Sequence, residues 1–282
     1  AVGKRIRVIS KQEWTDIKGK NFFAVLPGTD PKLRHEWIII SAYTDSISVV
    51  PSLPHGAEQL CSTATLIELA RLLKQKPPRR SVLFLLTSGH FQAMQGVRHF
   101  LEKRLQEGWA LTGGKTPLFA YCLDLSAGSP TLVATAQGWW LDYRPENIEG
   151  ERAIARALRN HIPRIAKVFK LPETTLFFDG VNNPDGRHWK NSIPGRYALE
   201  SEIFNLTGMN SLTFFTAEDA RLFQDTPSDT ADRVNLSNLL TQARTLYALL
   251  HHALNDTQNE ATGGDFAMPY RGGGSFKRSS LI

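Results

Sequence analysis

The sequence has very little cysteine and no long apolar run. Only Cys61 and Cys122 occur in 282 residues, which excludes a disulfide-rich scaffold and a cysteine-rich zinc module. No stretch of ~18 apolar residues occurs, so we expect no transmembrane segment in this chain. The two cysteines fall on an expected helix and an expected strand. They therefore predict two buried free thiols, with a Cys61–Cys122 bridge as the alternative.

A strong charge of one sign is also lacking. Lys and Arg number 33 and Asp and Glu 27, which gives a net charge of +6. Basic residues are frequent among the first twenty positions, but they are not interleaved with aromatic residues, and no zinc-finger or RNA-binding motif occurs. We therefore expect a solvated basic surface and no nucleic-acid partner. With 41% hydrophobic and 21% charged residues, the composition is that of a globular protein and excludes a wholly disordered one.

The pattern that is present alternates buried strands with amphipathic helices. Short apolar runs predict strands, and apolar residues at three- and four-residue spacing predict helices between them. The expected strands are 37–42, 81–86, 118–125 and 211–215, and the expected helices are 60–74, 92–106, 150–169 and 231–255. Residues 137–143 indicate a strand or a loop. This alternation predicts an α/β fold, a single three-layer α/β/α domain with a mixed, mainly parallel twisted sheet.

The ends of the chain and one interior segment have less regular sequences. Residues 5–10 and 21–26 both have the pattern of a strand, and a turn at 27–31 closes the second one. Together they predict an N-terminal hairpin, with residues 1–20 as its N-terminal part. Residues 172–198 are rich in Asn, Asp, Gly and Pro, which predicts a long loop. We expect one domain over 1–255 and a polar, Gly-rich tail or linker over 256–282. The sequence starts without Met, which indicates a removed leader or a piece of a longer chain.

Six sequence blocks occur in an order that resembles one family. Their positions are 21–31, 37–46, 56–58 with 66–71, 79–100, 123–124, and 208–215 with 225–230. They include the turn Pro27-Gly28-Thr29-Asp30 and the sequence Ala42-Tyr43-Thr44-Asp45-Ser46 after a buried strand. Together they resemble the co-catalytic zinc aminopeptidases. That group includes bacterial leucyl aminopeptidases and glutamate carboxypeptidases, and non-peptidase relatives such as transferrin receptor and nicastrin. The resemblance implies the zinc-aminopeptidase fold.

The resemblance also implies where a pair of zinc ions would be held. The family supplies two His, a bridging Asp, a metal-binding Glu and a further Asp as ligands. On this chain those ligand positions are occupied by Tyr43, Glu58, Phe91, Asp124 and Asp225. The family's general-base Glu falls on His90. The Asp that supports the first His is kept as Asp45.

Most of the implied zinc ligands are therefore replaced. Only Asp124 keeps its residue type. Tyr43 replaces a His, and its phenol, with pKa ~10, is a poor substitute for imidazole as a ligand. Phe91 has no ligand atom. Without zinc a cluster of carboxylates would repel itself, and His90 and Phe91 relieve that repulsion. We therefore expect no catalytic residue, no metal ligand and no cofactor. One alternative is a single divalent metal, Ca²⁺ or Mg²⁺, whose ligands would be Glu58, His90, Asp124 and Asp225. Another is that these carboxylates are ordinary loop residues.

These replacements favour a protein that is not an enzyme. We expect a catalytically inactive, zinc-aminopeptidase-like domain that serves as a scaffold or protein-binding module within a larger protein or complex. Its expected partners are proteins, in one version a membrane protein complex, and its expected location is extracytoplasmic or membrane-attached. The alternative is a divergent metal-dependent hydrolase, an aminopeptidase or amidase with a site rebuilt around His90. Ser88-Gly89-His90 is not a nucleophile elbow, because the Gly-x-Ser-x-Gly pattern is absent.

Overall fold

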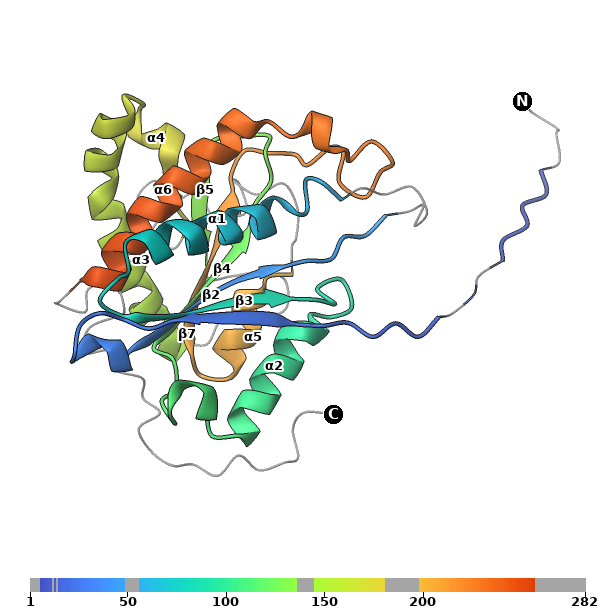
Figure 1. Ribbon diagram of the computed structural model, residues 1–282. Helices are drawn as coiled ribbons and strands as arrows, with labels where there is room; N and C mark the ends of the chain where they lie inside the picture. The colour runs from blue at the N-terminus through green and yellow to red at the C-terminus, as the bar shows by residue number, and fades with distance from the viewer. Residues whose placement is uncertain are drawn as a thin grey trace.

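The computed structural model describes residues 6–11, 13, 15–48, 56–135, 145–180 and 198–256, with backbone only for 145–150 and 179. Helices cover a central twisted sheet in this part of the chain (Figure 1). The strands are β1 (Phe22–Leu26), β2 (Trp37–Tyr43), β3 (Ser81–Thr87), β4 (Phe119–Asp124), β5 (Leu132–Thr135), β6 (Phe177–Asp179) and β7 (Asn210–Thr216). The α-helices are α1 (Cys61–Gln75), α2 (Gln95–Gln106), α3 (Pro145–Phe169), α4 (Glu173–Leu176), α5 (Glu200–Leu206) and α6 (Leu236–Asn255).

The described strands form one sheet in the order β1-β3-β2-β4-β7-β5-β6. The four central strands, β3, β2, β4 and β7, run parallel to one another. β1 is antiparallel to β3, and β5 is antiparallel to β7. Parallel neighbours need a crossover connection, and α1, α2 and α5 lie in the segments that return the chain between them. The sheet is thus mixed and mainly parallel.

Helices bury both faces of the sheet. Because side chains alternate along a strand, Ile38 and Ile40 of β2 enter the core under α1, α3 and α6, while Ile39 enters the core with α2 and α5. All three side chains are fully buried. Figure 1 shows α1 and α6 above the sheet and α2 and α5 below it. The α/β fold class and the three-layer arrangement predicted from the sequence are confirmed.

The predicted N-terminal hairpin is wrong. Residues 6–10 form no strand, and Phe22–Leu26 instead pairs with the buried strand β3. Asn21 accounts for this register, because its side chain donates to the carbonyl of Gly96 at 2.7 Å and accepts from the backbone N–H of Ser88 at 3.1 Å. The described residues before Asn21, which are 6–11, 13 and 15–20, are left as an exposed arm that extends away from the sheet in Figure 1.

Other differences lie outside the central strands. The start of the loop predicted at 172–198 contains α4 and β6. Three predicted segments lie outside the described residues, namely 181–197 of that loop, 137–143, and the tail from 257. β5 and α5 were not predicted, since four and seven residues carry too little periodicity. The last helix begins at Leu236, five residues later than predicted, because the Asn235 side chain caps it by accepting from the N–H of Asn238. The division into a domain over 1–255 and a tail stays a prediction.

No helix among the described residues is long and apolar enough to cross a membrane.

Candidate functional site

The central parallel strands end beside one another, and two of the singled-out residues meet there. β2 ends at Tyr43 and its parallel neighbour β4 ends at Asp124. Ligands in such sheets bind outside the carboxyl ends of the strands. The Tyr43 hydroxyl donates to Oδ1 of Asp124 at 3.1 Å, and both side chains are buried. Burial, together with the negative charge of Asp124, raises the pKa of Tyr43 well above its usual range, so its hydroxyl keeps its proton.

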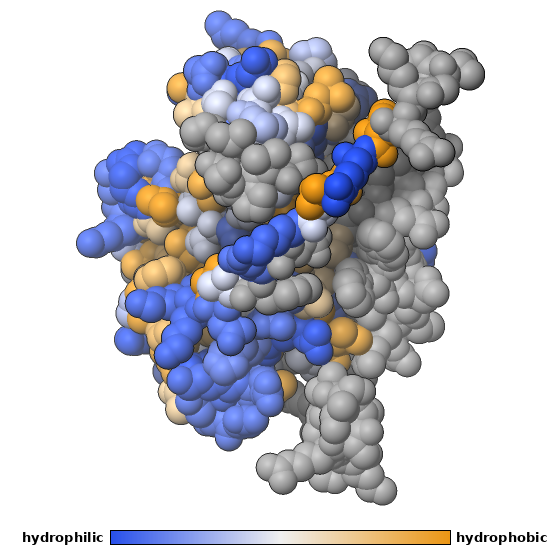
Figure 2. Space-filling view, turned by 90° about the vertical axis from the view of Figure 1, so that its right-hand side faces the viewer, coloured by the Kyte–Doolittle hydropathy of each residue, from blue (hydrophilic) through white to orange (hydrophobic). Residues whose placement is uncertain are grey.

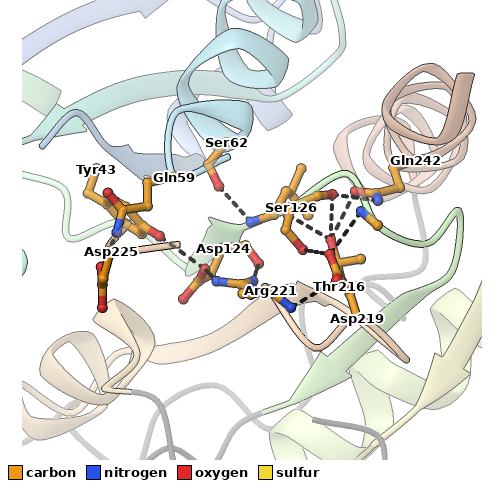
Figure 3. A network of polar contacts seen from close by, with 12 residues as sticks. Tyr43, Gln59, Ser62, Asp124, Ser126, Thr216, Asp219, Arg221, Asp225 and Gln242 are labelled. Carbon is orange, nitrogen blue, oxygen red and sulfur yellow. Dashed lines mark hydrogen bonds and ion pairs between the residues drawn. The ribbon is translucent and has the colours of Figure 1, made fainter. Parts of the chain in front are cut away.

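A cation from the chain itself also contacts Asp124. Nη1 of Arg221 lies 2.7 Å from Oδ1 of Asp124, and Nη2 donates to the Asp124 backbone carbonyl at 2.7 Å. The guanidinium carbon lies 3.9 Å from the centroid of the Phe215 ring, a cation–π contact. Arg221 is 5% exposed and Asp124 4% exposed, so this ion pair is shielded from water. Figure 3 shows the guanidinium against the Asp124 carboxylate.

Asp219 holds the loop that carries Arg221. Its carboxylate accepts from the Gly128 N–H at 2.8 Å. It also accepts from the Ser126 hydroxyl at 2.5 Å and from the Arg221 N–H at 3.0 Å (Figure 3). Arg221 has a φ of 46°, in the left-handed region that non-glycine residues rarely adopt. The hydrogen bond from its N–H to Asp219 stabilises that backbone conformation. Asp219 therefore ties the loop after β4 to the loop after β7 and positions Arg221.

His90 and Phe91 lie next to Tyr43 and form an aromatic cluster with it. The His90 ring stacks on the Tyr43 ring with centroids 4.0 Å apart and planes at 23°. Phe91 packs edge-on against both, at 5.8 Å from Tyr43 and 5.0 Å from His90. Asp45 accepts from the backbone N–H of His90 at 3.2 Å and of Phe91 at 3.5 Å. Asp45 thus holds this loop by its main chain, which differs from the role implied by the family resemblance.

A second buried carboxylate faces His90. Nδ1 of His90 lies 3.6 Å from Oε1 of Glu200, which is longer than a hydrogen bond but within ion-pair range. The Thr87 hydroxyl donates to the same Glu200 oxygen at 2.5 Å. Burial lowers the pKa of His90, but the charges of Glu200, Asp124 and Asp45 outweigh burial and raise it above the ordinary value. These carboxylates therefore make the cationic form of His90 easier to reach than that of a free imidazole.

Glu58 and Asp225 make other contacts. Asp225 accepts from Nε2 of Gln59 at 2.8 Å, and burial raises the pKa of its carboxyl. Glu58 lines a pocket of about 270 Å³ with Asp219, Asp229 and apolar side chains that include Phe223. Burial and the nearby charge of Asp219 raise the pKa of Glu58 to about 7.

The side chains present do not fit the zinc pair that the resemblance implies. One oxygen of Asp124 receives both the Tyr43 hydroxyl hydrogen and the Arg221 guanidinium, so a cation already neutralises it. Zinc in proteins takes about four N, S or O ligands, and Phe91 offers none. No group of three or more His, Cys, Asp or Glu among the described residues is placed to hold a metal ion. The alternative single-metal set of Glu58, His90, Asp124 and Asp225 is therefore not brought together as a metal site.

Sequence reasoning missed Arg221 and Glu200, which face Asp124 and His90, respectively, in the folded chain. Arg221 has no neighbour pattern that marks it, and 97 positions separate it from Asp124. Glu200 stands in the first turn of an unpredicted helix and contacts the end of β3 only in the folded chain. Cys61 and Cys122 are free and buried, as predicted, and form no bridge.

Comparisons with known proteins agree with this fold. The model of peptidase family M28 matches residues 21–113. The zinc aminopeptidase BSAP from Bacillus subtilis is 16% identical with a TM-score of 0.57, covering 88% of this chain and 53% of that one. LapA aminopeptidase from Legionella pneumophila is 13% identical, with a TM-score of 0.56 and coverage of 84% and 55%. A Zn-dependent exopeptidase from Parabacteroides distasonis is 12% identical, with a TM-score of 0.56 and coverage of 84% and 79%.

The chain therefore has the α/β fold of the zinc aminopeptidases. More particularly, residues 21–113 match the model of peptidase family M28, and the predicted resemblance to co-catalytic zinc aminopeptidases is confirmed. The chain spans about half the length of the first solved structures that it matches. The comparison with curated proteins gives no match.

Proposed function

We propose that this aminopeptidase-like domain is catalytically inactive and acts as a scaffold or protein-binding module within a larger protein or complex. One observation carries the proposal: the Arg221 guanidinium lies 2.7 Å from the carboxylate that the resemblance assigns as a metal ligand. The chain thus supplies a cation where the family uses an ion. Function belongs to sites rather than folds, so the fold alone does not make this domain a peptidase.

The contacts of Arg221 and His90 oppose two-metal hydrolysis in two ways. A divalent ion at Asp124 would lie against a fixed guanidinium. Two unit like charges at ~4 Å repel by roughly 4 kcal/mol at an effective dielectric constant of 20, and a doubly charged ion is repelled by roughly twice as much. In addition, water needs a bound ion to bring its pKa near ~7, and the raised pKa of His90 favours the protonated ring, which cannot accept a proton. Both the nucleophile and the base are therefore disfavoured.

The test is an assay of amino-acid amide hydrolysis with chromogenic substrates. We expect no turnover by the wild-type chain or by His90→Glu, with or without added zinc. In a working enzyme a general base contributes roughly 10²–10⁴ in rate, but here it has no metal-bound water to deprotonate. The four-fold variant Tyr43→His, Phe91→Glu, Asp225→His and Arg221→Ala, added to His90→Glu, is the matched attempt to rebuild the ligands. Wild-type turnover that a chelator abolishes would contradict the proposal.

A second candidate is a hydrolase rebuilt around His90. The observation in its favour is the buried His90–Glu200 contact, because a carboxylate beside imidazole is a common feature of acid–base sites. Turnover that His90→Gln and Glu200→Gln both abolish, and that a chelator does not affect, would support this candidate. A stoichiometric protein partner that co-purifies with the native, non-hydrolysing protein would favour the scaffold.

A further inference from the structure

The exposed side of α3 carries a row of basic side chains. Arg159, Arg164 and Lys167 in the helix and Lys170 directly after it are all exposed to solvent. With 3.6 residues per turn, Arg159, Lys167 and Lys170 lie on one side of the helix, and Arg164 lies at the margin of that side. The four residues, which we call the basic row, span roughly 16 Å along the helix axis.

The basic row has no acidic counterpart nearby. None of its four side chains forms an ion pair or a hydrogen bond in the described part of the chain. The segment from Arg152 to Phe178 contains one acidic residue, Glu173, and α6, which packs beside α3, contains none. α6 instead adds the exposed Arg244. Positive charge is therefore concentrated on this side of the molecule, although the net charge of the whole chain is only +6.

The helix dipole accounts for only part of this charge. Basic side chains near a helix C-terminus are stabilised by the dipole, but the effect falls off within the last turn. It applies to Lys167 and Lys170, whereas Arg159 and Arg164 lie more than one turn before the end of α3 at Phe169. Like charges at helical spacing repel one another. The basic row therefore disfavours the isolated domain slightly, and an anionic surface would remove that repulsion.

Apolar side chains lie beside the C-terminal end of the basic row. Val168 is 71% exposed and Leu171 36% exposed. No aromatic side chain is fully exposed within residues 152–174, all of which the structure describes. Proteins that bind single-stranded nucleic acids stack the bases on aromatic side chains. Helices that lie on lipid surfaces instead combine Lys and Arg with apolar side chains that enter the headgroup region. The mixture on α3 thus fits a lipid surface better than a nucleic acid.

We propose that the basic row of α3 binds the surface of a membrane that contains anionic phospholipids. Each Lys or Arg near such a surface contributes about five-fold in affinity, so four of them supply roughly several hundred-fold. α3 lies at the left of Figure 1, whereas Figure 2 looks onto the opposite side of the molecule, which includes the carboxyl ends of the central strands. The candidate site would therefore stay open to solution in the bound domain. This proposal is independent of whether the domain is an enzyme.

The test is co-sedimentation of the full chain with vesicles of phosphatidylcholine and phosphatidylglycerol in a three-to-one ratio, over a lipid titration. We expect binding at low ionic strength, release by high salt because salt screens these charges, and no binding to pure phosphatidylcholine. Arg159→Gln with Lys167→Gln should weaken binding roughly 30-fold. The matched control, Arg98→Gln with Lys115→Gln, removes the same exposed charge from α2 and the segment after it and should bind like wild type.

All four substituted side chains are exposed, so both variants should fold, and circular dichroism checks this. A wild-type chain that does not bind the anionic vesicles would overturn the proposal. Unchanged binding by the α3 variant would also overturn it, as would an equal loss in the control, which would mean that only the net charge matters. Tighter binding to duplex DNA or to polyglutamate than to the vesicles at the same salt would overturn it as well, and would point to a nucleic acid or an acidic protein as the partner.

Discussion

Removing Arg221 should destabilise the protein strongly, because it leaves Asp124 as a buried charge without a counter-ion. In Arg221→Ala the carboxylate loses a guanidinium at 2.7 Å, its backbone carbonyl loses a second bond of 2.7 Å, and Phe215 loses a cation–π contact. Breaking one partner of a buried ion pair costs about 3–5 kcal/mol, and the cation–π contact adds roughly 0.5–2 kcal/mol. We expect the free energy of unfolding to fall by about 4 kcal/mol.

The assay is urea unfolding at neutral pH, followed by circular dichroism. The matched control is Arg233→Ala, because Arg233 also packs on an aromatic ring, Phe223, but is exposed; its loss should be below ~1 kcal/mol. The double variant Asp124→Leu with Arg221→Met should recover most of the stability, since apolar replacement of a buried pair is often neutral or favourable. A loss below ~1 kcal/mol for Arg221→Ala would refute the argument that this pair holds the site together.

Two pH-dependent predictions follow from other buried groups. Burial raises the pKa of Glu151 to about 8, against a hydrogen bond from Asn205, so the folded state holds this proton more tightly and stability falls as the pH rises from about 4.5 to 8. In Glu151→Gln, the decrease in the free energy of unfolding between pH 5 and pH 8 should be smaller than in wild type by on the order of 3–5 kcal/mol. Unfolding experiments at the two pH values measure this difference, and parallel pH profiles of the two proteins would contradict the prediction. For His90, whose pKa is raised, stabilisation is complete below the unfolded pKa and is lost as the pH rises through the folded one. NMR titration should give His90 a pKa above ~6.5 that Glu200→Gln lowers, and a value below the ordinary one would refute this account.

Local sequence patterns predicted the central strands because those strands are buried on both faces. Ile38, Ile39 and Ile40 form a continuous apolar run that suits only such a position. The alternation in residues 6–10 also indicates a strand, but a strand forms only if this segment pairs with another strand of the sheet. Asn21 fixes the position of β1 beside β3 through contacts with Ser88 and Gly96, which are far away in sequence. Periodicity cannot contain this information.

The candidate site was predictable to the same extent. Tyr43, His90 and Asp124 follow or end buried strands, so the fold brings them together. The ion pair was not predictable, because Arg221 belongs to a loop whose backbone conformation is set by Asp219. Local sequence patterns predict where the strands end, whereas the contacts of a loop depend on the whole folded chain.

The Arg221–Asp124 pair has a consequence for how the protein depends on its surroundings. A metal ion is a separate molecule, which has to be acquired after synthesis and can be removed by a chelator or by scarcity. A guanidinium is covalently part of the chain and stays charged at every physiological pH. The charge balance of Asp124 is therefore complete as soon as the loop after β7 folds onto β4. In the metal-free domain that we propose, this site would form in the same state whether or not zinc is available to the cell.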